Sequence, residues 1–466
     1  MAKKIKAPVT KNEYHHVTFE DLTHEGAGVA KVDGYPLFVP NGLPGEEAEI
    51  KVIKAGKGFG IGRLIERHTT SADRVEPPCP IYDRCGGCQL QHLSHDAQSN
   101  FKRQQIVNAL HKYMGNSDIP VHSTLTMDEP WSYRNKAQVP VGVNRDGELI
   151  AGFYAKRSHQ IVDMDHCLIT GEQNDQAVQV VKGLLKKFNI PPYDEKTGEG
   201  NVRHIVARSS HHTGEVMVVF VINKKHLPHI NEIIEEMQTQ IPKLRSVVKN
   251  VNRKDTNVIF GEETEVLWGE RTIEDKIGDV RFLISPRSFF QVNPMQTEVL
   301  YNKVMEYAQL TGKETVIDAY CGIGSISLFL AQQAKHVYGV EVVGDAIRDA
   351  KNNAELNNMK NVDFVVGKAE EVVPWWQAAH GIQADVFVVD PPRKGCDPAL
   401  LETMVQMKPE RIVYVSCNPA TLARDLKVLA EDGGYEVKEI TPVDMFPQTT
   451  HVESVAWLER VFVTRK

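Results

Sequence analysis

"TVIDAYCGIGSISLFLAQQAKHVYGVE", residues 315–341, joins one short apolar run to another through a glycine-containing turn and a helical pattern. This succession predicts a strand, a helix and a second, parallel strand, which is the repeating unit of an α/β sheet. Open sheets of this kind bind ligands beyond the carboxyl ends of their strands. The turn "DAYCGIG" is therefore a candidate ligand site.

The alternation of apolar runs and helical patterns continues to the C-terminus. Further strands are expected at "VDFVVG", "ADVFVVD" and "RIVYVS", with helices at 345–358, 397–407 and 420–432. Two last strands near 435–441 and 453–463 complete the pattern. The sequence predicts a Rossmann-like α/β domain with a sheet of about seven strands.

Length and composition indicate a soluble globular protein of several domains. The chain has 466 residues, of which 41% are hydrophobic and 25% charged, and roughly 150 residues per domain suggests about three domains. The longest apolar run, "VMVVFVI" at 216–222, is too short to span a membrane, and the basic start lacks the apolar core of a signal peptide. We therefore expect a cytoplasmic protein with no membrane partner. We also expect the protein to be a monomer.

The N-terminal third differs from the rest of the chain. Residues 14–67 contain short β-rich runs separated by Gly, Asn and Pro, which predicts a small β-barrel. The net charge of −7 argues against attraction of nucleic acid to the whole surface, but residues 50–64 carry four positive charges and no negative one. A helix is expected at 94–114, and one helix near 173–188 within the mixed region 130–283.

The glycine turn suits an adenosine-containing ligand. Gly322 and Gly324 allow a close approach to the backbone, and Glu341 ends the second strand 23 residues after Asp318, where an acidic side chain can bind a ribose diol. No G-K-S or G-K-T phosphate loop is present. These features favour S-adenosylmethionine over ATP as the ligand.

Two reactive side chains follow later strands of the same predicted sheet. Asp390 ends "VFVVD" and precedes two prolines, while Cys417 follows "RIVYVS" and precedes a helix that Pro419 can begin. Asp390 is either a turn cap or a site residue. Cys417 is either a packed thiol or a nucleophile, and the residues alone leave both interpretations open.

Five motifs together resemble the RNA uracil-C5 methyltransferases. They are "FFQVNP" (289–294), "DAYCGIG", "DPPRKG", "SCNPATLARD" and "MFPQTTHVE" (445–453), in that order. Within the family the chain is most similar to Gram-positive enzymes that modify two uridines of 23S rRNA. The resemblance implies a TRAM-like RNA-binding β-barrel at 1–70, a mixed central domain at 71–285 and a class I methyltransferase domain at 286–466, on which the helix at 94–114 is expected to pack.

The resemblance also implies a reaction and its residues. A methyl group passes from S-adenosylmethionine to C5 of a looped or flipped uridine in 23S rRNA, giving 5-methyluridine. Cys417 adds to C6 as the nucleophile and Glu453 removes the C5 proton. The remaining residues of the cofactor and pyrimidine site are Gln291, Tyr320, Gly322, Glu341 and Asp390. Lys368 departs from the acidic residue often found after the third strand.

The seven cysteines fall into two groups. Cys79, Cys85 and Cys88 form a C-x5-C-x2-C pattern and Cys167 follows at a distance. Four thiolates suit either zinc or an iron–sulfur cluster. The spacing resembles the structural [4Fe–4S] site of the ribosomal members of the family; zinc and metal-free cysteines are the alternatives.

Several alternatives remain at this stage. The same chemistry could act on tRNA. RNA cytosine-C5 methylation is disfavoured, because that class has a cysteine directly after its Asp-x-Pro, whereas here Cys396 lies six positions after Asp390. A radical enzyme or a non-enzymatic RNA-binding protein fits fewer motifs.

One further motif is a candidate RNA contact. "WSYRNKAQ" (131–138) places aromatic residues beside Arg134 and Lys136. Aromatic side chains stack on the bases of looped RNA and cationic ones bind its phosphates, so this stretch is expected to contact the substrate.

Overall fold

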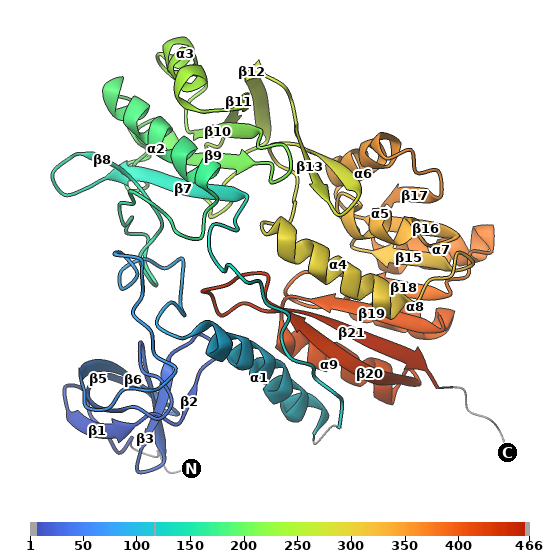
Figure 1. Cartoon of the computed structure of the whole chain (residues 1–466), viewed down its shortest axis with the longest axis horizontal. Helices are drawn as coiled ribbons and strands as arrows, with labels where there is room; N and C mark the ends of the chain where they lie inside the picture. The colour runs from blue at the N-terminus through green and yellow to red at the C-terminus, as the bar shows by residue number, and fades with distance from the viewer. Residues whose placement is uncertain (1–6, 116–117, 462–466) are drawn as a thin grey trace.

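Three large β-sheets and one hairpin organise the computed structural model, which describes residues 7–115 and 118–461 (Figure 1). The expected domains at 1–70 and 286–466 thus include residues 1–6 and 462–466, which lie outside the described residues. The same holds for the end of the strand expected at 453–463. In the described part of the chain, no helix is long and apolar enough to cross a membrane.

The N-terminal sheet is a small barrel-like unit of six strands in the order β1-β5-β6-β4-β3-β2 (Figure 1). Apolar side chains alternate along its strands, and Phe19, Leu37 and Ile50 are buried in its core. A Cβ atom on Gly60 would lie 2.6 Å from the Leu37 side chain, so only glycine fits there. This confirms the β-rich unit predicted for 14–67. The strands are β1 (Tyr14–Thr18), β2 (Asp21–Leu22), β3 (Gly28–Val32), β4 (Tyr35–Val39), β5 (Glu47–Ala55) and β6 (Gly60–Arg67).

Helix α1 (His95–Met114) follows the barrel and confirms the helix predicted at 94–114. Its N-terminus is capped by Ser94, whose hydroxyl accepts a hydrogen bond from the backbone N–H of Ala97. Ile106 and Leu110 are buried in the same hydrophobic cluster as core residues of the C-terminal sheet. Helix α1 therefore packs on the C-terminal unit, although the barrel precedes it in the chain.

The central sheet has the order β12-β11-β10-β9-β7-β8, and α2 and α3 cover it (Figure 1). The apolar run 216–222 is the fully buried strand β10. The expectation of a single helix in this region is wrong, because α3 also forms and buries Ile233, Ile234 and Met237 at helical spacing. The elements are β7 (Lys136–Val143), β8 (Leu149–Ala151), α2 (Glu172–Lys187), β9 (Val202–Ser209), β10 (Val216–Ile222), α3 (Ile230–Gln240), β11 (Leu244–Val251) and β12 (Glu263–Gly269). A hairpin of β13 (Ile273–Ile277) and β14 (Val280–Ile284) follows.

The C-terminal sheet has seven strands, as predicted, in the order β17-β16-β15-β18-β19-β21-β20. The first five strands in this order are parallel to one another, whereas β21 runs antiparallel to both β19 and β20. The chain leaves β15 in one direction for β16 and β17 and returns on its other side at β18. This switch point is where an open α/β sheet leaves a crevice for a ligand.

Helices flank this sheet (Figure 1). Two of them, α4 and α7, go beyond the sequence expectation; α7 contains Pro374, a residue that usually interrupts a helical pattern. The elements are α4 (Pro294–Ala308), β15 (Thr315–Ala319), α5 (Ser325–Ala331), β16 (His336–Glu341), α6 (Gly344–Leu356), β17 (Val362–Val366), α7 (Ala369–His380), β18 (Val386–Val389), α8 (Pro398–Met407), β19 (Arg411–Ser416), α9 (Pro419–Glu431), β20 (Tyr435–Val443) and β21 (Glu453–Arg460).

Candidate active site

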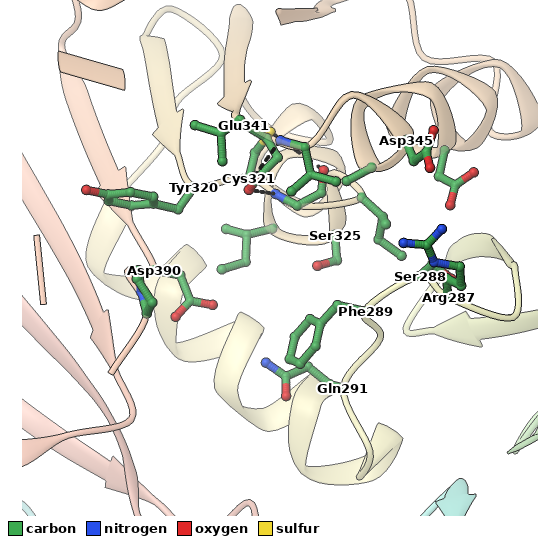
Figure 2. A pocket seen from close by; sticks show the side chains of 18 of the residues that line it. Arg287, Ser288, Phe289, Gln291, Tyr320, Cys321, Ser325, Glu341, Asp345 and Asp390 are labelled. Atoms are coloured by element: carbon green, nitrogen blue, oxygen red, sulfur yellow. Dashed lines mark hydrogen bonds between the residues drawn. The ribbon is translucent and has the colours of Figure 1, made fainter. Parts of the chain in front are cut away.

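A cavity of about 1730 Å³ opens at the carboxyl ends of β15, β16, β18 and β19 (Figure 2). This cavity is lined by every residue that the family resemblance assigned to catalysis or to the cofactor. Figure 2 shows Gln291 and Phe289 reaching in from the segment before α4, with Asp390 and Tyr320 on another side. The seven residues are Gln291, Tyr320, Gly322, Glu341, Asp390, Cys417 and Glu453.

The turn between β15 and α5 needs its glycines for two different reasons. Gly322 has φ +55° and no atom within 4 Å of the position of a Cβ, so it leaves open space at the wall of the cavity. Gly324 has φ +79°, and a Cβ there would lie 2.8 Å from the Phe364 ring. One glycine thus keeps room for a ligand, and the other lets the turn pack against the sheet.

Glu341 is held in place at the end of β16. Its two carboxylate oxygens accept hydrogen bonds from the backbone N–H groups of Gly322, at 3.3 Å, and of Val343, at 3.0 Å. Figure 2 shows these bonds at the upper wall of the cavity. The carboxylate retains acceptor positions for a ligand because an ionised carboxylate has about four.

Asp318, named above only for its spacing from Glu341, also lines the cavity. It is fully buried at the end of β15, and one carboxylate oxygen accepts a hydrogen bond from the Ser327 hydroxyl at 2.5 Å. The other oxygen, Oδ1, has no partner among the described residues. Burial raises the pKa of Asp318 to about 7, against the opposing bond from Ser327. Its position at the end of the first strand, next to the glycine turn, was the available signal.

Cys417 and Glu453 meet because β19 and β21 are antiparallel. Ser416 pairs with Ser454, so Cys417, directly after the end of β19, and Glu453, the first residue of β21, lie next to each other. Cys417 is half-buried, whereas Glu453 is only 6% exposed. Burial raises the pKa of the Cys417 thiol to about 11, with a further contribution from Glu453.

Burial and carboxylate repulsion act on Glu453 as well. Burial raises the pKa of Glu453 well above its usual range, Asp390 raises it further, and Arg393 opposes both effects. Burial also raises the pKa of Asp390. Two acids and a thiol thus share one part of the cavity, which is an arrangement typical of proton transfer and nucleophilic chemistry.

The loop after Asp390 is fixed by the helix that follows Cys417. Asn418 caps α9 and donates from its amide to the backbone carbonyl of Arg393 at 3.0 Å. The Thr421 hydroxyl donates to the same carbonyl at 3.3 Å, and the Arg424 guanidinium donates to Lys394 O at 3.0 Å. These bonds set the position of Asp390 relative to Cys417.

A second cavity, of about 780 Å³, reaches Cys417 from another direction. It lies between the barrel, helix α1 and the start of α9. Exposed polar side chains of α1 line it, among them Asn100, Gln104 and Asn108. Arg393, Cys417 and His451 line both cavities, so two open spaces meet at the thiol.

The four cysteines predicted as metal ligands also lie together. Cys79, Cys85, Cys88 and Cys167 line a third cavity of about 300 Å³, and each is a free thiol. Within residues 7–115 and 118–461, no group of three or more His, Cys, Asp or Glu side chains is placed to hold a metal ion. Burial raises the pKa of the Cys85, Cys88 and Cys167 thiols.

The motif at 131–138 is only partly available for RNA. Tyr133 is 2% exposed and donates its hydroxyl to Pro447 O at 3.0 Å, so the expectation that it stacks on a base is wrong. Arg134 lines the active-site cavity, and Lys136 lines the cysteine cavity. Lys368 lines the active-site cavity as well and forms an exposed ion pair with Glu371.

Comparison with known proteins shows what the chain is similar to. Residues 108–461 match the family described as tRNA (Uracil-5-)-methyltransferase, and residues 8–65 match the TRAM domain. An RNA methyltransferase of Halalkalibacterium halodurans is 60% identical over 98% of this chain and 99% of its own length. One from Bacillus cereus ATCC 14579 is 58% identical over 99% of this chain and 100% of its own length.

A solved structure resembles nearly the whole chain. It is the Pyrococcus abyssi tRNA (uracil-54, C5)-methyltransferase in complex with S-adenosyl-L-homocysteine. It is 32% identical, has a TM-score of 0.76, and the match covers 95% of this chain and 100% of that chain.

Proposed function

The chain belongs to the tRNA (uracil-5-)-methyltransferase family and carries a TRAM domain, so it is an S-adenosylmethionine-dependent RNA methyltransferase, and we propose that it methylates C5 of uridine in 23S rRNA. The proposed mechanism rests on the proximity of Cys417 and Glu453 in the active-site cavity. A thiol and a carboxylate at one place supply the nucleophile and the base that this reaction needs.

Cys417 is the proposed nucleophile. Uracil C5 is too weakly nucleophilic to take a methyl group unaided. The Cys417 thiolate forms a bond to C6, and the electron pair of the C5=C6 double bond moves to give an enolate, whose C5 is nucleophilic. That carbon takes the methyl group of S-adenosylmethionine as the bond from the methyl to the sulfonium sulfur breaks, and S-adenosylhomocysteine is the leaving group. Burial and the nearby carboxylates raise the pKa of this thiol, and Arg393 opposes part of that rise.

Glu453 is the proposed base for the second half of the reaction. It takes the proton from C5, the C–H electron pair restores the C5=C6 double bond, and the bond between Cys417 Sγ and C6 breaks. The thiolate is regenerated and the product 5-methyluridine leaves. Burial and Asp390 raise the pKa of Glu453, which makes its carboxylate a stronger base than an exposed one.

The other cavity residues are assigned to binding. The Glu341 carboxylate suits a ribose diol, and the open acceptor on Asp318 suits the ammonium group of S-adenosylmethionine. Gly322 provides the room for this ligand. Tyr320, Gln291 and Asp390 complete the cofactor and pyrimidine site, with Asp390 directed either to the uracil edge or to the cofactor.

The RNA is proposed to approach along the second cavity. A base inside a duplex cannot reach Cys417, so the target is a looped or flipped uridine. The barrel carries exposed Phe59 and Tyr14, and Lys51 lies 5.2 Å from the Tyr14 ring centroid, an arrangement suited to single-stranded RNA. We further propose barrel, central and catalytic domains at 1–70, 71–285 and 286–466, in a monomeric enzyme.

A tRNA uridine is the second candidate substrate. It is favoured by the solved Pyrococcus abyssi relative, which is a tRNA methyltransferase. Mapping 5-methyluridine in 23S rRNA and tRNA from a strain that lacks this gene separates the two. Loss from 23S rRNA supports the proposal, loss from tRNA alone transfers the activity to tRNA, and loss from neither contradicts both.

RNA cytosine-C5 methylation is the weaker alternative. The cytosine enzymes have a cysteine directly after an Asp-x-Pro sequence, whereas here Asp390, just after β18, is followed by Pro-Pro-Arg. Cys396 is only 3% exposed and lines neither the active-site cavity nor the second cavity. Incubation with labelled S-adenosylmethionine and RNA should label uridine, and label in cytidine would overturn the assignment.

The four clustered cysteines are proposed to hold a [4Fe–4S] cluster with a structural role. The donor set fits, because four thiols line one cavity and thiolates are the usual ligands of such clusters. The methyl transfer itself needs no electron transfer.

A further inference from the structure

The segment 444–452 has no regular secondary structure, yet it leads directly to Glu453. It joins the end of β20 to the start of β21, and its Phe446 and His451 line the active-site cavity. The placement of the proposed base therefore depends on how this segment is held.

Side chains from outside the segment hold its backbone. Four consecutive carbonyl groups, those of residues 444–447, each accept a side-chain hydrogen bond. The donors are Gln296 to Asp444 O at 3.1 Å, Asn293 to Met445 O at 3.1 Å, Lys102 to Phe446 O at 3.0 Å and Tyr133 to Pro447 O at 3.0 Å. The path of the segment is thus fixed by several parts of the chain.

One face of helix α1 supplies a large share of these contacts. Gln98, Lys102 and Gln105 follow one another at i, i+4 and i+7, so they lie on the same side of the helix. Gln98 exchanges two hydrogen bonds with Gln448, each at 3.0 Å. Gln105 donates to Thr450 O at 2.9 Å. The three side chains reach the beginning, the middle and the end of the segment.

The central contact is a fully buried ion pair. Lys102 and Asp444 are both 0% exposed, and Lys102 Nζ lies 2.5 Å from Asp444 Oδ1. The same carboxylate oxygen accepts a hydrogen bond from Phe446 N at 3.2 Å. Buried ion pairs often add little stability over apolar residues of similar size, because both charges lose their hydration. Stability alone is therefore a weak reason for this pair.

We propose that Gln98, Lys102 and Gln105 of helix α1 are positioning residues that hold segment 444–452 so that Glu453 lies beside Cys417. The proposal rests on the proposed function, in which Glu453 is the base. The neighbouring face of α1, which Gln105 borders, lines the second cavity, and Phe101 on that face packs near Leu43 and Leu22 of the barrel. The helix thus connects the RNA-binding unit to the proposed base.

The test uses a charge-neutral double variant, Lys102→Met with Asp444→Asn. It removes the bonds from Lys102 without leaving a buried unpaired charge, and the oxygen of the introduced amide can still accept from Phe446 N. The chain offers a control pair of the same residue types in the central unit. Lys182 is 7% exposed, lies 2.7 Å from Oδ1 of Asp163, whose side chain is 41% exposed, and donates to Met164 O at 3.2 Å. The control is Lys182→Met with Asp163→Asn.

The measured quantities are kcat, the Kd for S-adenosylmethionine and the fraction of enzyme held as a methylated RNA adduct on a denaturing gel. We expect kcat of the α1 variant to fall about 10- to 100-fold, as a misplaced catalytic group would cause. Its adduct fraction should rise, and its Kd for S-adenosylmethionine should stay unchanged. Both variants are expected to lose thermal stability, but the control should retain the wild-type adduct fraction.

A wild-type adduct fraction in the α1 variant, or an equal loss of kcat in both variants, would overturn the proposal. If the double variant does not fold, Gln105→Ala removes only the bond to Thr450 O and should shift the adduct fraction in the same direction by less. Measuring Glu453→Gln in the same assay separates the positioning role of α1 from the assignment of Glu453 as the base. If Glu453→Gln accumulates adduct and the α1 variants do not, the positioning role is wrong. If Glu453→Gln does not accumulate adduct, the assignment of the base is wrong.

Discussion

The hydroxyl of Ser454 donates a hydrogen bond to the backbone carbonyl of Ser416 at 3.3 Å. These two serines face each other across the antiparallel strands β19 and β21. Both are buried, so the register of the two strands is fixed at this point. One step beyond the pair lie Cys417 and Glu453, so the sheet brings the backbones of the proposed nucleophile and base together, and segment 444–452 leads into Glu453 from the other side.

Replacing Cys417 by Ala removes the thiolate and should abolish both methyl transfer and the covalent RNA adduct. The side chain is half-buried at the meeting point of two cavities, so the substitution should leave the fold and the binding of S-adenosylmethionine intact. Label transfer and a denaturing gel measure the two effects. A Cys417→Ala protein that still methylates RNA would defeat the mechanism.

Glu453→Gln should separate the two halves of the reaction. Addition and methyl transfer need the thiolate and the cofactor, which the variant keeps, whereas elimination needs the base. A methylated, covalently bound RNA–protein species should therefore accumulate, and turnover should fall by about 10²- to 10⁴-fold. Turnover at the wild-type rate would mean that another residue takes the C5 proton.

Asp318 should make the ligand-free enzyme less stable as the pH rises. Its pKa is about 7 in the folded protein against an ordinary value of 3.8, so between these values the unfolded chain has released a proton that the folded chain still binds. The free energy of unfolding falls with rising pH across this window and is unaffected by Asp318 below it. Asp318→Asn removes this dependence.

Urea unfolding of both proteins at about pH 5 and about pH 8 tests this expectation. At the higher pH the Asp318→Asn variant should be more stable than the wild type by roughly 1–4 kcal/mol, since one pKa unit corresponds to about 1.4 kcal/mol. Its affinity for S-adenosylmethionine should fall, because Oδ1 no longer carries charge. Equal pH dependence of the two proteins would show that Asp318 does not titrate in this range.

The two glycines of the β15–α5 turn should respond differently to alanine. Gly324→Ala combines a positive φ with a contact of 2.8 Å to Phe364, so we expect a loss of about 2–5 kcal/mol of stability. Gly322→Ala has the positive φ but no atom near the new methyl group, so about 1 kcal/mol is expected. Cofactor titration should show the larger loss of affinity, relative to the stability change, for Gly322→Ala.

Anaerobically purified protein should be brown and contain iron and sulfide if the four clustered cysteines hold a [4Fe–4S] cluster. Cys85→Ser or Cys88→Ser should lower the iron content, since both thiols line the 300 Å³ cavity. Cys396→Ser is the matched control: Cys396 is also a buried free thiol but lies outside that cavity. Colourless protein with one equivalent of zinc would overturn the cluster.

Local sequence patterns were sufficient to predict the strands of the C-terminal sheet, but not the antiparallel pairing of β19 with β21. Alternation of apolar runs and helices predicted seven strands and placed Gly322, Glu341 and Asp390 at their carboxyl ends. The approach of Glu453 to Cys417 depends on the reversed direction of β21, which neither residue's neighbours encode. Only the family resemblance pointed to Glu453.

Contacts between distant parts of the chain also could not be predicted from local sequence patterns. Asp318 looked like one more strand residue; only the assembled structure shows that it lines the cavity and that its Oδ1 has no partner among the described residues. Tyr133 looked like an exposed aromatic residue because its partner, Pro447, lies 314 positions away. Such burial is a property of the assembled fold.

The pairing of Lys102 with Asp444 also has a consequence for synthesis of the chain. The two residues are 342 positions apart, so at 5–20 residues per second roughly 20–70 s pass between their appearance on the ribosome. During that time α1 has neither β20 nor α9 to cover its apolar side. Nascent chains should therefore expose Ile106 and Leu110 to proteases and chaperones until the last quarter of the protein has emerged.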